Sequence, residues 1–309
     1  MADDESYPRD MIGYGRTPPH PRWPGNARIA LQFALNYECG AETNILHGDA
    51  SSEGVLNDIG APAVPGERIA PVEGVFEFGS RVGAWRFLRI MRDFEIKCSF
   101  LATGMAIERN PEIARVAAEE GHEMVGHGYR WISHHGMSVE QERDYIAKAV
   151  DSIRRITGKR PVGWLSGRSG GANTRRLLVE EGGFLYDRDC LNDELPYWTE
   201  VEGKPHLCVP YSFETNDLRF GVGGDWVTGE QFFSYMRDAF DLLYAEGETQ
   251  PKMMTVALHD RIIGRPARAQ GLVRFLEHVR KHDRVWLATG EEVARHWMEH
   301  FPAPEKQPA

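Results

Sequence analysis

Short apolar runs alternate with amphipathic stretches along most of the chain. Residues 28–35 form a nearly continuous apolar run, which is typical of a strand buried on both faces. Residues 80–94 instead repeat apolar side chains at helical spacing. The same reasoning predicts further strands at 97–102, 123–126, 162–165, 184–186, 206–210, 253–258 and 285–287. It predicts further helices at 111–120, 138–157, 173–181, 229–246, 267–282 and 291–300.

This alternation predicts an α/β fold in which parallel strands are joined by right-handed crossovers. An open sheet and a closed barrel would give the same alternation, and a length of 309 residues suits one barrel as well as two domains. Polar residues follow many of the strands, which favours a barrel with its site at the carboxyl ends of the strands: Glu38, His127, Arg168, Asp187 and His259.

The remaining segments are irregular. Residues 1–27 are rich in proline and aromatic residues, and we expect an ordered arm outside the barrel of residues 28–300. Residues 301–309 form a polar tail. The polar stretch 41–75 is long for a connection, so we expect it to contact substrate or another subunit, as in a homo-oligomer such as a tetramer.

Composition narrows the choice of partners. A formal net charge of -10 argues against nucleic acid or an anionic membrane as partner. The four cysteines lack CxxC spacing, which predicts reduced thiols rather than a zinc or disulfide framework. The acidic start lacks the order of a secretory signal, and no apolar run is long enough to span a bilayer. We therefore expect a cytoplasmic protein.

The sequence Gly126-His127-Gly128-Tyr129-Arg130-Trp131 follows a predicted strand. The two glycines let a substrate approach the imidazole closely. In this stretch the chain resembles the polysaccharide deacetylases, which carry His-Ser/Thr-x-x-x-His with both histidines on a divalent metal. Here Trp131 stands at the second position, and an indole nitrogen cannot bind a metal.

Three other motifs carry the same resemblance. The segment Asn36-Tyr37-Glu38 stands where the deacetylases keep two aspartates, Arg168 stands where an arginine braces the catalytic base, and the Leu-His motif at His259 supplies the general acid. Within the superfamily the chain is most similar to the metal-independent allantoinases. The resemblance implies a distorted (β/α) barrel without a metal cofactor.

The residues from which we expect chemistry are Glu38, His127, His259 and Arg168. With no cation beside it, Glu38 should have a raised pKa; alternatively, it is an ordinary carboxylate paired with an arginine. We expect a second group to contact the substrate: Asn36, Tyr37, Trp131, Trp164, Asp187 and Trp198. His134 and His135 are expected to be solvated.

The resemblance implies hydrolysis of the ring amide of allantoin to allantoate, in purine and ureide catabolism. In this scheme Glu38 or His127 activates water, Arg168 with backbone donors holds the oxyanion, and His259 protonates the departing nitrogen. A cyclic imide hydrolase would share these motifs. A metal-dependent N-deacetylase would require a bound metal, and a non-catalytic protein would merely bind a ligand.

Overall fold

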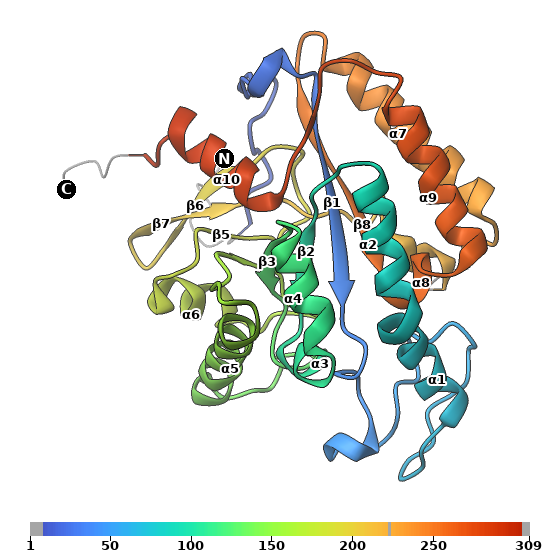
Figure 1. Cartoon of the computed structure of the whole chain (residues 1–309). Helices are drawn as coiled ribbons and strands as arrows, with labels where there is room; N and C mark the ends of the chain where they lie inside the picture. Colours follow the sequence, from blue (N-terminus) through green and yellow to red (C-terminus); the bar gives the residue numbers. More distant parts are fainter. Residues whose placement is uncertain (1–8, 222–223, 305–309) are drawn as a thin grey trace.

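The computed structural model describes residues 9–221 and 224–304 (Figure 1). The expectations for the first eight residues of the arm and the last five of the tail lie outside this part of the chain. The strands are β1 (Ile29–Tyr37), β2 (Ser99–Ala102), β3 (Glu123–Gly126), β4 (Gly163–Trp164), β5 (Tyr186–Asp187), β6 (Tyr197–Val201), β7 (Lys204–Cys208), β8 (Lys252–His259) and β9 (Val285–Leu287).

One curled sheet contains all of these strands, in the order β6-β7-β5-β4-β3-β2-β1-β8. Strand β9 pairs with the first residues of β1, on the same edge of β1 as β2 but before the residues that pair with β2. All pairs are parallel except β6 with β7. Strand β1 is buried at all nine residues, as its continuous apolar run predicts.

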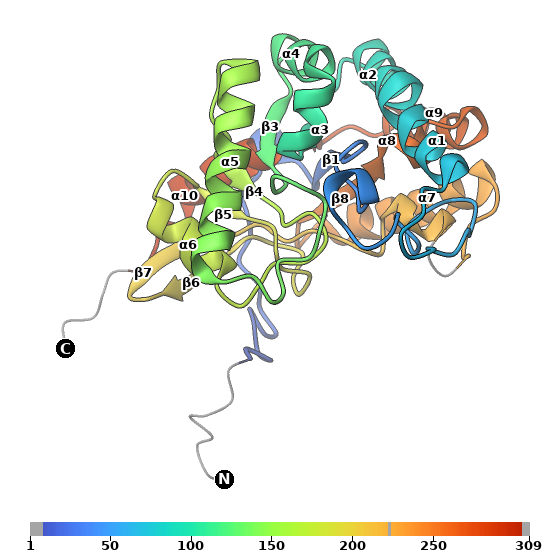
Figure 2. The ribbon, with the colours of Figure 1, turned by 90° about the horizontal axis from the view of Figure 1, so that it is seen from below.

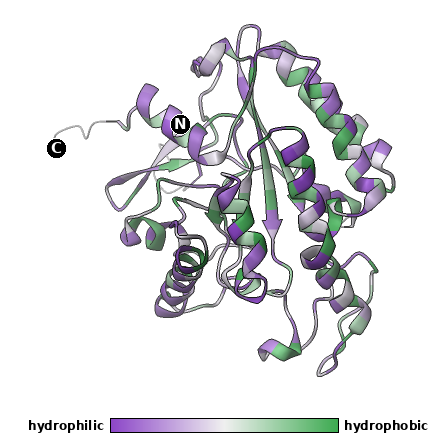
Figure 3. Ribbon diagram, viewed as in Figure 1, coloured by the Kyte–Doolittle hydropathy of each residue, from purple (hydrophilic) through white to green (hydrophobic). Residues whose placement is uncertain are grey.

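The helices lie outside the strands. Figure 2 shows α5, α4, α2 and α9 in an arc along the sheet, and Figure 3 shows that the strands at the centre are the more hydrophobic elements. The helices are α1 (Ala70–Phe78), α2 (Ala84–Asp93), α3 (Gly104–Arg109), α4 (Pro111–Glu119), α5 (Val139–Thr157), α6 (Thr174–Glu181), α7 (Gly229–Glu246), α8 (Asp260–Ile263), α9 (Pro266–Val279) and α10 (Gly290–His300).

The sheet does not close by pairing β6 with β8. Two irregular segments instead fill the gap and bond to β8, through Met253 N–H to the Glu194 carbonyl (3.0 Å) and Ala257 N–H to the Thr215 carbonyl (2.9 Å). The result is the distorted (β/α) barrel that the sequence predicts, curled as a half-barrel and completed by loops.

The region predicted as one helix over residues 80–94 is more complex. It contains most of the π-helical turn η3 (Gly79–Gly83), which directly follows α1, and the whole of α2. A methyl group at Gly83 would overlap the carbonyl oxygen of Asp260, so this turn needs glycine to pack against α8. Helices α1, α3 and α8 and strand β6 were not predicted, because each is short or lacks a clear period. Residues 70–75, which were expected to be irregular, belong to α1.

The N-terminal arm packs against the amino-terminal end of the strands. Trp23 is buried, and its indole N–H donates to the carbonyl of Lys252 at the start of β8 (2.9 Å). Its ring contacts Trp286 and Trp297. The arm therefore covers the end of the barrel opposite to Glu38 and His259.

None of the helices within residues 9–221 and 224–304 combines the length and the apolar character needed to cross a membrane.

Candidate active site

A cavity of about 600 Å³ lies at the carboxyl ends of the strands. Glu38 follows β1, His127 follows β3, and His259 is the last residue of β8, so the sheet brings all three to its wall. A second cavity of similar volume, about 610 Å³, lies beside it and shares Leu191 with it but is lined by no histidine. The chemistry of the site therefore belongs to the first cavity.

The Glu38 carboxylate is the centre of this site. Its Oε1 lies 3.1 Å from His127 Nε2 and 3.7 Å from His259 Nε2, and its Oε2 accepts a hydrogen bond from Arg261 Nη1 at 2.7 Å. All four side chains are buried. One carboxylate thus faces a guanidinium and two imidazoles away from bulk water.

This arrangement reverses the expected pKa shift of Glu38. Burial by itself would raise the pKa, but the charges of His259 and Arg261 and the hydrogen bond from His127 outweigh burial and lower the pKa to about 2. The expectation of a raised pKa was wrong because it assumed that no cation lies beside the carboxylate. Glu38 is therefore ionised at neutral pH.

His259 is oriented by a carboxylate from another part of the chain. Its Nδ1 lies 2.7 Å from Asp217 Oδ1, while Asp217 Oδ2 accepts the backbone N–H groups of His259 (2.9 Å) and Ile263 (3.1 Å). Asp217 is fully buried and opens the turn η4 (Asp217–Phe220). Because Nδ1 carries the proton toward Asp217, Nε2 of His259 is left facing the cavity and Glu38.

His127 is held at both ring nitrogens. Nδ1 lies 2.8 Å from the carbonyl oxygen of Leu165 and Nε2 lies 3.1 Å from Glu38 Oε1. His127 is therefore fixed in the cavity wall by contacts at both ring nitrogens.

Arg261 enters the site from α8 and was not predicted. Its guanidinium lies over the rings of Phe76 and Trp131, with distances from Cζ to the ring centroids of 4.9 and 4.8 Å. The Trp131 indole N–H donates to the Gly167 carbonyl (2.8 Å), and the ring also lines the cavity.

A divalent metal of the deacetylase type does not fit these residues. Glu38 already faces a guanidinium, and the indole of Trp131 offers no ligand in place of a second histidine. A second cation beside Arg261 would also be repelled.

Arg168 lines the cavity. The resemblance implied that it would brace Glu38, but it does not contact that carboxylate. Its Nη1 lies 2.6 Å from Glu53 Oε2, and Glu53 belongs to the long segment predicted to lie on the substrate side. That segment also places Leu56 in the cavity wall. The arginine that contacts the Glu38 carboxylate is Arg261, so the expectation that Arg168 braces this carboxylate is corrected.

Of the residues expected to contact substrate, Asn36 and Trp131 line the cavity. Three others do not. Tyr37 bonds to Ser80 in the core behind the sheet (2.8 Å), Trp164 packs on Phe184, and the Trp198 indole donates to the Phe301 carbonyl (2.7 Å).

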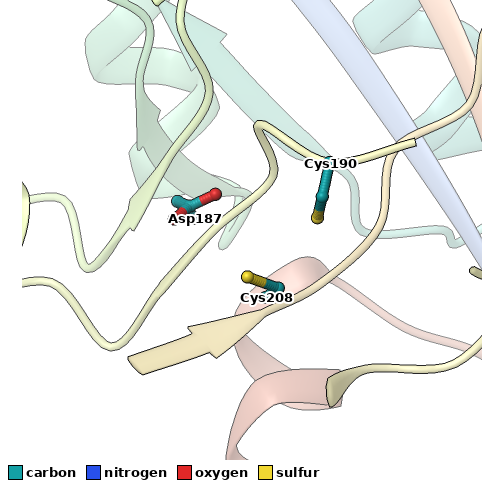
Figure 4. A group of neighbouring side chains, drawn as sticks. All are labelled: Asp187, Cys190 and Cys208. Atoms are coloured by element: carbon teal, nitrogen blue, oxygen red, sulfur yellow. The ribbon is translucent and has the colours of Figure 1, made fainter. Parts of the chain in front are cut away.

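Asp187 also lies outside the cavity wall. Arg175 Nε and His206 Nε2 lie 2.7 and 2.9 Å from its Oδ2. Figure 4 shows Asp187 beside Cys190 and Cys208, and one ligand atom from each lies within 4.8 Å of the others. Because Arg175 and His206 already pair with this carboxylate, it is not a free ligand. The next acidic residue, Asp189, lines the cavity instead.

His134 was expected to be solvated, but it is buried. Its Nδ1 lies 3.0 Å from Glu142 Oε1. Its neighbour His135 is exposed. The pair of His134 with Glu142 anchors the loop after β3 to helix α5.

Comparison with known proteins agrees with this fold. The family model for polysaccharide deacetylases matches residues 71–184. A Schizosaccharomyces pombe protein named "Putative polysaccharide deacetylase" is 36% identical over 314 residues, which cover 95% of this chain and 98% of that protein.

Two solved structures are still more similar. The crystal structure of Puue allantoinase has 49% identity and a TM-score of 0.94, covering 96% of this chain and 99% of that one. A structure described as "probable Polysaccharide deacetylase from Pseudomonas aeruginosa PAO1" has 50% identity and a TM-score of 0.93, with 96% and 100% covered. The chain is a hydrolase that belongs to the polysaccharide deacetylase family.

Proposed function

We propose that the protein hydrolyses the ring amide of allantoin, a cyclic ureide, to give allantoate. The observation that carries this proposal is the pairing of Glu38 with Arg261, because it leaves an ionised carboxylate and two histidines but no metal site. The likeness to Puue allantoinase over nearly the whole chain supports the same substrate.

The side chain best placed to move a proton is His259. Asp217 holds Nδ1 and orients the ring, so Nε2 can accept a proton from a water molecule beside Glu38. The water oxygen attacks the ring carbonyl, and the carbon–nitrogen bond then breaks. The same Nε2 returns the proton to the departing nitrogen. The new carboxylic acid loses the second proton of the water to solvent and leaves as a carboxylate.

Glu38 has a different role from the one expected. A carboxylate with a pKa of about 2 is a weak base at neutral pH. It can still accept a hydrogen bond from the attacking water and stabilise positive charge on His259 as the proton is taken. Glu38 therefore orients the water and supports His259, rather than removing the proton itself.

The reaction has to be one that needs no Lewis acid. A metal contributes several kcal/mol by polarising an acyl carbonyl. A ring ureide is easier to open than an acetamide, since its leaving nitrogen is conjugated with a second carbonyl. Arg168 lines the cavity and carries donors that can contact such a carbonyl group. The amide of Asn36 also lines the cavity, but it already donates to the Tyr211 hydroxyl and the Leu258 carbonyl.

A substrate panel tests the proposal. The purified protein would be incubated with allantoin, with succinimide as a cyclic imide and with N-acetylglucosamine oligomers, and the products would be measured by mass spectrometry. We expect allantoate from allantoin and no acetate from the oligomers. Preferential opening of succinimide would assign a cyclic imide hydrolase instead, and acetate release alone would contradict the proposal.

A further inference from the structure

Arg261 is an unusual side chain for the centre of a hydrolase site. It has no exposed surface, and Glu38 is the acidic side chain with which its guanidinium forms an ion pair in the described part of the chain. Burying an arginine at this depth is costly unless the charge is matched. The ion pair with Glu38 supplies that match.

Two aromatic rings lie against the guanidinium of Arg261. Nε and Nη2 of Arg261 have no hydrogen-bond partner among the described residues, whereas the rings of Phe76 and Trp131 both lie within 5 Å of Cζ. Aromatic faces attract cations, most strongly when water is excluded. Trp131 and Phe76 thus hold the guanidinium in place through cation–π contacts.

The same tryptophan lies beside His127, because both rings lie next to Gly167. The guanidinium and the two histidines surround one carboxylate, and the indole lies against the guanidinium. Any cation that approached Glu38 would meet a positive charge already fixed 2.7 Å from its Oε2.

We infer that Arg261, packed against the rings of Trp131 and Phe76, is the fixed cation of this site, where it holds Glu38 in place and excludes divalent metals. Trp131 supports this arrangement by holding the guanidinium through its ring face. The inference depends on the proposed function for its activity measurements, but its metal-binding measurements stand without it.

Zinc binding gives the test that does not depend on activity. A group on the outer helices, Asp241, His278 and His282, has ligand atoms within 4.8 Å of one another and could take up zinc. Every protein in this test would therefore carry His282→Ala, which removes one ligand of this outer group. His282 does not line the cavity. Zinc would be titrated by calorimetry into this parent, into Trp131→His, and into Trp131→His with Arg261→Ala.

We expect no zinc binding at the Glu38 site of the parent and one zinc per chain in the double variant. The single variant, which retains Arg261, should bind at least about tenfold more weakly than the double variant. Adding Glu38→Gln should abolish the new site. Zinc binding by the parent that is lost on Glu38→Gln, or a folded double variant that binds none, would overturn the inference.

Activity and folding give the second test. Arg261→Met keeps much of the volume but removes the charge, so we expect kcat for ring opening to fall at least about 100-fold while KM changes little. Arg261→Lys keeps the charge without the planar fork and should recover part of kcat. Circular dichroism would establish that each variant is folded. Full activity in folded Arg261→Met would refute the inference even if allantoin is the substrate.

Discussion

Glu38 connects the charged side chains of the site. Its carboxylate lies beside Arg261, His127 and His259, and Asp217 lies behind His259. Glu38 and the Leu165 carbonyl therefore position the His127 ring, and Asp217 positions the His259 ring. The proposed proton transfer depends on the tautomer of His259, which Asp217 determines.

Asp217→Asn tests this tautomer directly. The Asn oxygen can still accept the two backbone N–H groups, but its amide would then face Nδ1 and force the proton onto Nε2. We expect kcat for ring opening to fall by about 10²–10⁴-fold with little change in KM. Asp241→Asn on the outer face of α7 serves as the control, and a kcat within twofold of wild type for Asp217→Asn would exclude the relay.

Asp260→Asn tests whether burial raises the pKa of Asp260, the carboxyl group that precedes Arg261 in the chain. Burial raises the pKa of Asp260 to about 7, although the nearby charge of Arg261 lowers it. Between the ordinary pKa near 4 and pH 7 the folded protein thus holds a proton that the unfolded chain releases, so Asp260 costs stability as pH rises through that window.

Asparagine removes this cost and retains an acceptor for the Arg261 backbone N–H and the Cys39 thiol. We expect the unfolding free energy of Asp260→Asn, relative to wild type, to rise by roughly 4 kcal/mol from pH 4 to pH 8. Denaturant unfolding at a series of pH values would measure it. If the difference in unfolding free energy between Asp260→Asn and wild type did not change with pH, the pKa of Asp260 would not be raised in the folded protein.

At the scale of elements, the loop over residues 41–69 forms one wall of the site. Glu53 is buried, bonds to Arg168, and accepts the backbone N–H groups of Val55 and Leu56. Leu56 in turn lines the cavity. The loop is thus attached to the segment after β4 by one ion pair at the edge of the cavity.

Glu53→Gln should loosen this attachment. Gln retains one acceptor oxygen but loses the charge opposite Arg168, so we expect KM to rise by about 3–30-fold with a smaller change in kcat. Glu291→Gln, which alters the pair with Arg295 within α10 and touches neither the cavity nor this loop, is the matched control. An unchanged KM in Glu53→Gln would mean that the loop does not shape the substrate site.

Element prediction succeeded where a single period dominates. The apolar runs at β1 and β8 and the helical stripe of α7 predicted those elements within one or two residues. The π-helical turn η3 could not be predicted, because it depends on contact between Gly83 and the backbone of Asp260. That contact joins positions 177 residues apart (260 minus 83).

At the scale of the whole molecule, the barrel explains which site residues the sequence could predict. Glu38, His127 and His259 each stand at or just after the end of a strand, so a pattern of strands brings them together. Asp217 and Arg261 were missed because their partners lie 42 and 223 positions away, and no local pattern specifies such pairs. The pairing of Arg168 with Glu53 was missed for the same reason.

The central claim is that this chain opens a ring amide with its own side chains and no metal. The most direct test is turnover of allantoin by protein dialysed against a strong chelator, with its metal content measured in the same sample. We predict unchanged production of allantoate at far less than one metal ion per chain. Turnover that disappears on chelation and returns in proportion to added zinc would contradict the account.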